Sequence, residues 1–304
     1  MSEALFKHIL VPVDLGETSV GALHFAGIFA TKFGAKVTLL YADELATLFA
    51  DYDPAWISYN VSPGEEAKRV QESIHKLAAE HLQGVEQPEI HVVPGHPIAT
   101  ISRISREDNV DLIVMGTHGR RGWRRALVGS VADGVVRESR QPVLVVPKRQ
   151  DGAYSGSIRR IVCPVNFTDA AREAVRYAAS LAKAFDAELI LVHVAESSPL
   201  PFETATVDQL FTEWLPSDVA GHSSLRHLVL RGGPAERVLD CVEDIGADLL
   251  VMGAQLKWLR SESVIGTTSE RLLRFANVPI LTIARRAQRP AEPERVAEPQ
   301  EARE

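Results

Sequence analysis

The chain has 304 residues, which is long enough for two domains that each bury a hydrophobic core. Its net charge of −7 argues against a general nucleic-acid-binding protein, because such proteins carry a basic surplus. The sequence has no apolar run near the roughly 18 residues of a membrane helix, no signal-peptide pattern and only two cysteines. We therefore expect a cytoplasmic protein that engages neither nucleic acid nor membrane.

The sequence contains an internal repeat, which predicts two domains of the same kind. The matching segments are HILVPVD (8–14) with RIVCPVN (160–166), GAKVTLLYA (34–42) with DAELILVHV (186–194), GHPIATI (95–101) with GGPAERV (232–238), DLIVMG (111–116) with DLLVMG (248–253), and QPVLVVP (141–147) with VPILTIA (278–284). The last three pairs share a smaller offset, so the second copy lacks a segment before its third strand. We predict a first domain (1–148), a polar linker (149–157), a second domain (158–286) and a disordered, Pro- and Glu-rich tail (287–304).

Each half alternates short Val-, Ile- and Leu-rich runs with segments of helical periodicity. The runs in the first half are ILVPV, VTLLYA, EIHVV, LIVMG and VLVV. Their continuous apolar character predicts strands covered on both faces. Gly34 is placed to end the first helix, and Thr168 to cap the corresponding helix of the second half. The predicted fold is α/β, with two tandem open doubly wound parallel-sheet (Rossmann-like) domains that have five-strand cores.

The stretch after the fourth strand, GTHGRRGWRRALVGS (116–130), has the composition of an anion-binding loop. Its glycines let backbone N–H groups approach an anion, and its four arginines add positive charge. We expect a helix to begin at Ser130, with Asp133 placed for a capping box. Glycine after a strand and serine before a helix also occur in ordinary connections, so the spacing alone leaves both interpretations open.

Together, VPVD (11–14), Gly116-x-x-Gly119, nine further residues and Gly129-Ser130 resemble the ATP-binding branch of the universal stress protein family. The resemblance covers nearly the whole chain as two tandem domains. It implies ATP as the ligand, with any Mg²⁺ held through the phosphates. The residues that it implies are Pro12, Val13 and Asp14 at the adenine and ribose, Ala42 packed on adenine, and Gly116, Gly119, Gly129, Ser130 and Val131 at the phosphates. Without the loop, Asp14 would be interpreted as a turn residue or helix cap.

The second copy serves as an internal comparison for this site. Leu256 stands where the first half has Gly119, and Asn166 stands where it has Asp14. A leucine side chain occupies space that a phosphate needs, and the amide lacks the ribose-binding charge. Thr267 and Glu270 keep a capping-box spacing. We expect the first half to bind nucleotide and the second site to be degenerate; the alternative is a different, less charged ligand.

No nucleophile–base pair stands out, so the sequence favours a binding protein over an enzyme. A slow ATPase and an interaction scaffold with vestigial pockets remain as alternatives, and the protein partner is unknown. The histidines of the first half (His75, His81, His91 and His96) are interpreted as surface residues rather than metal ligands. The resemblance implies that the last strands of the two halves pair within the chain as a pseudo-dimer, and it leaves open a homodimer of whole chains.

Overall fold

The computed structural model of the chain describes residues 4–44, 63–85, 87–117, 129–148, 154–195, 204–220, 224–259 and 262–286. The first half contains β1 (His8–Pro12), α1 (Glu17–Phe33), β2 (Lys36–Asp43), α4 (Pro63–His81), β3 (Glu89–Pro94), α5 (Pro97–Glu107), β4 (Leu112–Gly116), α6 (Ser130–Glu138) and β5 (Val143–Val146). The second half contains β6 (Arg160–Pro164), α7 (Asp169–Phe185), β7 (Glu188–Ala195), α8 (Thr204–Trp214), α9 (Ser217–Ala220), β8 (Leu225–Arg231), α10 (Pro234–Ile245), β9 (Leu249–Leu259), β10 (Glu262–Ile265), α11 (Thr267–Phe275) and β11 (Ile280–Arg286). None of the helices in these ranges is long and apolar enough to cross a bilayer.

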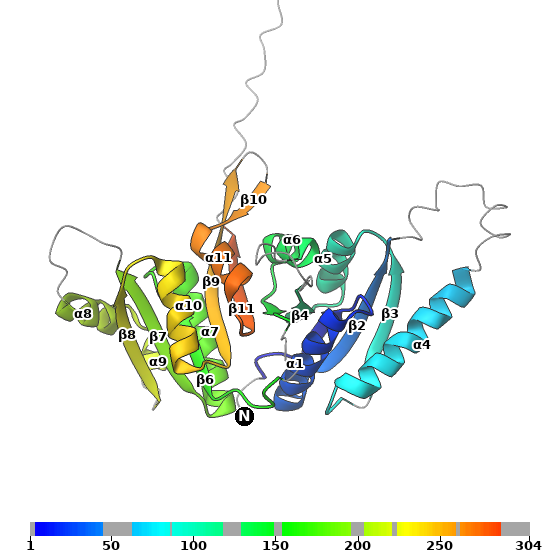
Figure 1. Cartoon of the computed structure of the whole chain (residues 1–304), viewed down its shortest axis with the longest axis horizontal. Coiled ribbons are helices and arrows are strands. Elements are labelled where there is room, and N and C mark those ends of the chain that lie inside the picture. Colours follow the sequence, from blue (N-terminus) through cyan, green and yellow to red (C-terminus); the bar gives the residue numbers. More distant parts are fainter. Residues whose placement is uncertain are drawn as a thin grey trace, which may run out of the picture.

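The strands form one continuous sheet in the order β3-β2-β1-β4-β5-β11-β9-β6-β7-β8, with β10 added to β9 (Figure 1). Within each half the five core strands run parallel. The predicted α/β fold class is therefore confirmed. In each half the chain moves first to one side of its first strand and then to the other, which places a switch point between β1 and β4 and between β6 and β9.

The two halves meet through their last strands, β5 and β11, which pair antiparallel. Leu144 lies opposite Leu281, and the buried Thr282 hydroxyl donates to the Val143 carbonyl oxygen at 3.1 Å. The expected intramolecular pairing is thus present, and it leaves neither strand with an unpaired edge on that side.

Helices cover both faces of the sheet, as the continuous apolar strands require (Figure 1). One buried cluster lies under α1, α4, α7 and α8, and the other under α5, α6, α10 and α11. The apolar face of α1, which includes Phe25 and Phe29, is buried. Gly34 ends α1 in the left-handed conformation with φ of 67°, which glycine adopts without strain.

In each half, an aspartate just before the fourth strand forms hydrogen bonds with the backbone at the start of the first strand. The Asp111 carboxylate accepts the backbone N–H groups of Lys7 and His8, at 2.8 and 2.9 Å. In the second half, Asp248 accepts those of Arg159 and Arg160 in the same way, at 2.8 and 3.0 Å. The aspartate that begins each repeated segment, DLIVMG and DLLVMG, therefore accepts hydrogen bonds from the backbone with its side chain.

The predicted side-chain N-caps are right for one helix and wrong for two. The Thr168 hydroxyl caps α7 by accepting the Ala171 N–H at 3.3 Å. The predicted capping boxes at Ser130 and Thr267 are wrong, because glycine is the N-cap of both α6 and α11 and neither helix has a side-chain cap. The acids that would have completed the boxes instead pair along the helix, Asp133 with Arg137 and Glu270 with Arg274.

The end of the predicted linker packs on the first half. The Tyr154 ring contacts His24 and Phe25 of α1, and its hydroxyl donates to the Pro147 carbonyl oxygen at 3.1 Å. Gly21 makes room for this ring, since a Cβ at that position would lie 2.5 Å from the tyrosine oxygen. The tail (287–304) and the earlier part of the linker lie outside the described residues, and the domain boundaries stay predictions.

Candidate functional site

A pocket of about 300 Å³ lies at the carboxyl ends of β1, β2 and β4 in the first half. This is the side of the switch point at which open α/β sheets bind ligands. Its volume is at the lower end of the roughly 300–1,000 Å³ that is usual for small-molecule sites. The lining residues are Pro12, Val13, Asp14, Thr18, Ser19, Leu40, Tyr41, Ala42, Asp43, Glu44, Pro97, Ile101, Met115, Gly116, Val131 and Ala132.

Six of the predicted site residues line this pocket, namely Pro12, Val13, Asp14, Ala42, Gly116 and Val131. Gly129 and Ser130 lie next to Val131 at the start of α6, but they are not part of the lining. Gly119 and the four loop arginines fall in residues 118–128, outside the described residues. The structure thus brings together the residues expected around the base and ribose, whereas the expected phosphate contacts are only partly described.

The walls of the pocket are largely apolar. Val13 and Met115 contribute from the ends of β1 and β4, Leu40 and Ala42 from β2, and Ile101 from α5. Apolar walls with a few polar groups at the rim suit a flat, weakly polar ring such as a nucleobase.

Asp14 is the central polar group at the rim. Its Oδ1 accepts the Gly16 N–H at 3.0 Å and the Ser19 hydroxyl at 2.6 Å, and its Oδ2 accepts the Thr18 hydroxyl at 2.9 Å. The first of these bonds is an Asx-turn, so the turn role that the sequence left open for Asp14 is present. These hydrogen bonds fix the orientation of the carboxylate at the rim of the pocket.

Gly116 is required by packing as well as by its place in the pocket. A Cβ at this position would lie 2.1 Å from the carbonyl oxygen of Thr18 in the first turn of α1. Gly253, its counterpart in the second half, is equally constrained, because a Cβ there would lie 2.4 Å from the carbonyl oxygen of Ala170. The close approach of strand and helix therefore explains why both copies keep this glycine.

The charged residues among the described lining are all acidic: Asp14, Asp43 and Glu44. The Glu44 carboxylate lies 3.7 Å from the ring of His96. Positive character in the described part comes from the N-terminus of α6, which has Gly129 as its N-cap and no side-chain cap. An anionic group is therefore favoured near the start of α6 rather than at the end of β2.

The second half has a different structure at the corresponding place. β9 continues through residues that correspond to the first half's loop, and it forms an antiparallel hairpin with β10. Leu256 lies within this strand, opposite Ile265 on one side and Arg286 on the other. Its backbone is thus in the sheet rather than in an anion-binding loop, while the Asn166 oxygen is used by the Thr168 hydroxyl at 2.7 Å.

The sequence did not single out several lining residues, although the repeat contained a signal for two of them. Pro97 and Ile101 belong to GHPIATI, one of the repeated segments, and lie on α5 beside the pocket. Thr18 and Ser19 lie four and five residues after Asp14, the last residue of the VPVD segment, and orient its carboxylate. Tyr41 carried no distinguishing signal.

Three of the four histidines that were considered as metal ligands, His81, His91 and His96, lie beside different carboxylates. His91 is 4.0 Å from Asp108, and His81 is 3.8 Å from Glu80. Across the described ranges, no three His, Cys, Asp or Glu side chains are grouped to hold a metal ion.

Comparisons with known proteins give consistent matches along the whole chain. A model described as "Universal stress protein family" matches twice, over residues 5–147 and 157–284. Universal stress protein MJ0531 of Methanocaldococcus jannaschii is 33% identical over 149 residues, covering 48% of this chain and 85% of that protein. Universal stress protein Rv2319c of Mycobacterium tuberculosis is 22% identical over 299 residues, covering 90% of this chain and 99% of that protein. The crystal structure of a universal stress protein from Archaeoglobus fulgidus shares the fold, with a TM-score of 0.70, 23% identity, and coverage of 93% of this chain and 99% of that one.

Proposed function

Since the chain belongs to the universal stress protein family, we propose that its first half binds ATP as a regulatory ligand whose occupancy is signalled to a protein partner. The observation that carries the proposal is the pocket at the switch point, with Asp14 at its rim and apolar walls behind. The setting that we propose is the cytoplasm, because both cysteines are buried free thiols, which a reducing compartment preserves.

In this proposal the adenine lies between the apolar walls formed by the ends of β1, β2 and β4. Asp14 accepts hydrogen bonds from the ribose hydroxyls, since its carboxylate is already oriented by Thr18 and Ser19. The phosphates extend toward Gly129 and Ser130 at the start of α6, where the helix dipole and the backbone N–H groups favour anions. Any Mg²⁺ is held through the phosphates.

The second half supports the proposal by contrast. It keeps the elements that the fold needs, including Gly253 and the helix α11, but has a β-hairpin in the segment that corresponds in sequence to the glycine- and arginine-rich stretch of the first half. We therefore propose one nucleotide site per chain.

The test is calorimetric titration of the full chain with ATP. Asp14→Asn should weaken binding about tenfold or more, because a hydrogen bond to a charged group contributes about 1.5–3 kcal/mol and 1.4 kcal/mol is a factor of ten. Asn166→Asp is the matched control in the second half and should leave the affinity unchanged. Gly119→Leu, which copies the second half, should also reduce binding.

Two outcomes would reject the proposal: absence of ATP binding at millimolar nucleotide, or equal affinity in wild type and both first-half variants. Chromatography of the nucleotide after incubation with ATP and Mg²⁺ separates a binding protein from a slow ATPase. Release of ADP that Asp14→Asn abolishes would assign the protein to the enzymes instead.

A further inference from the structure

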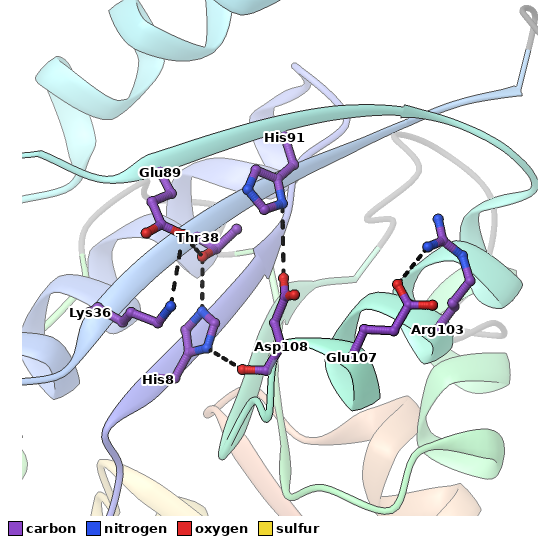
Figure 2. Close-up of polar contacts among 8 residues, drawn as sticks. All are labelled: His8, Lys36, Thr38, Glu89, His91, Arg103, Glu107 and Asp108. Carbon is purple, nitrogen blue, oxygen red and sulfur yellow. Dashed lines mark hydrogen bonds and ion pairs between the residues drawn. The ribbon is translucent and has the colours of Figure 1, made fainter.

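A polar cluster lies at the amino edge of the first-half sheet (Figure 2). The pocket lies at the other edge, where β1, β2 and β4 end. His8 is the first residue of β1 and is 4% exposed, and Thr38 of β2 is fully buried beside it. Glu89 begins β3 and reaches Thr38 from the surface, so the three side chains connect three adjacent strands (Figure 2).

Both ring nitrogens of His8 have a hydrogen-bonding partner. Nδ1 lies 3.0 Å from the carbonyl oxygen of Asp108. A carbonyl oxygen only accepts, so Nδ1 carries a hydrogen in every protonation state of the ring. Nε2 lies 2.9 Å from Oγ1 of Thr38. In the neutral ring, Nε2 therefore has no hydrogen and must accept one from the threonine hydroxyl.

The Thr38 hydroxyl has two acceptors within reach but only one hydrogen. Besides His8 Nε2, its Oγ1 lies 3.3 Å from Oε2 of Glu89. When His8 is neutral, the hydroxyl donates to Nε2 and the contact with Glu89 is not a hydrogen bond. When Nε2 takes a proton, it donates to Oγ1, and the hydroxyl hydrogen can turn to the Glu89 carboxylate.

We propose that His8, Thr38 and Glu89 form a proton-operated switch, in which the Thr38 hydroxyl donates to neutral His8 and turns to Glu89 when a proton from solvent binds Nε2. The two states have the same heavy-atom contacts and differ in the direction of two hydrogen bonds. The protonated state places a buried positive charge between strands, so acidification weakens this edge of the sheet.

Charged side chains from β2, β3 and the end of α5 surround the His8 ring. Lys36 of β2 lies 3.8 Å from Glu89 and opposes protonation of His8. Asp108 at the end of α5 favours protonation, as does Glu89, and His91 of β3 lies 4.0 Å from Asp108. Asp111 accepts the backbone N–H of His8.

The balance of these effects gives the direction of the pH dependence. Burial lowers the pKa of His8 below 6.5, although the hydrogen bond to the Asp108 carbonyl opposes this. The unfolded chain then binds the proton more readily than the folded chain. The stability that neutral His8 contributes is complete above pH 6.5 and is lost as the pH falls from 6.5 through the folded-state pKa.

The test is a nitrogen-detected NMR titration of the histidine rings in the full chain. We expect neutral His8 to carry its hydrogen on Nδ1 and to titrate below 6.5. Thr38→Val should lower the pKa of His8 further, because the protonated ring loses its acceptor. Thr38→Ser keeps the hydroxyl and should leave the pKa near that of wild type. Glu89→Gln, at an exposed position, should lower it because the charge that favours the protonated state is removed.

A stability measurement gives an independent readout. The urea midpoint of the full chain should fall more steeply between pH 7 and pH 5 in Thr38→Val than in Thr38→Ser. A hydrogen on Nε2 of the neutral ring would overturn the proposal. So would an unchanged His8 pKa in Glu89→Gln, which does not depend on whether the valine variant folds.

Discussion

Replacing Gly116 with alanine tests the packing role of this glycine between β4 and α1. The added Cβ would lie 2.1 Å from the carbonyl oxygen and 2.7 Å from the carbonyl carbon of Thr18. Both are backbone atoms in the first turn of α1, so no side-chain rotation relieves the contact. Either β4 or the start of α1 must move by about 1 Å to restore van der Waals separation.

The expected cost is about 3 kcal/mol of the free energy of unfolding, the upper end of the usual 1–3 kcal/mol for overpacking, because backbone must move. The same movement displaces Thr18 and Ser19, whose hydroxyls orient Asp14. We therefore expect Gly116→Ala to weaken ATP binding in addition to lowering stability.

Urea unfolding of the full chain, followed by circular dichroism, measures the first effect. Gly253→Ala is the matched variant in the second half, where a Cβ would lie 2.4 Å from the Ala170 carbonyl oxygen. It should cost a similar stability and leave ATP affinity unchanged. Gly156→Ala meets no atom within 4 Å and should stay within about 0.5 kcal/mol of wild type. A Gly116→Ala protein as stable as Gly156→Ala would refute the packing argument.

Two further substitutions test contacts that the repeat and the linker make. Asp111→Ala leaves the backbone N–H groups of Lys7 and His8 without their acceptor and should lower the free energy of unfolding by about 2 kcal/mol; a denaturation midpoint equal to that of wild type would contradict this role. Tyr154→Ala leaves space above Gly21 and should cost about 1–2 kcal/mol, since the ring is only half-buried; protease cleavage near the linker should also become faster, and an unchanged rate would argue against docking.

Much of the site was predictable because its residues lie at the ends of strands that the sequence marks clearly. The apolar runs located β1, β2 and β4, and parallel order brings the residues that follow them to one edge. Gly116 was located in this way, whereas Asp14 and Ala42 were implied by the resemblance to the universal stress protein family. Tyr41 and Thr18 line the same pocket without a sequence signal. The place of Thr18 depends on how closely α1 approaches β4.

The predictions that were wrong concern the N-caps of two helices. Ser130 and Thr267 have side chains suited to capping, yet each is the first residue of its helix and the preceding glycine is the N-cap. The acids expected to complete the capping boxes pair with arginines instead. The hairpin of β9 and β10 was not predicted, since GAQLKWLRSESVIGT lacks a turn dipeptide typical of hairpins.

The sequence by itself determined the repeat, the parallel α/β order and the asymmetry between Asp14 and Asn166, because hydrophobic period and residue identity are local properties. Tertiary structure decided how the two halves join, since the pairing of β5 with β11 depends on edges far apart in the chain. It also decided that Gly116 has a packing role, because only the folded chain brings Thr18 against it. The hydrogen-bond network of His8 depends on three strands and a helix end meeting at one point, which no segment specifies alone.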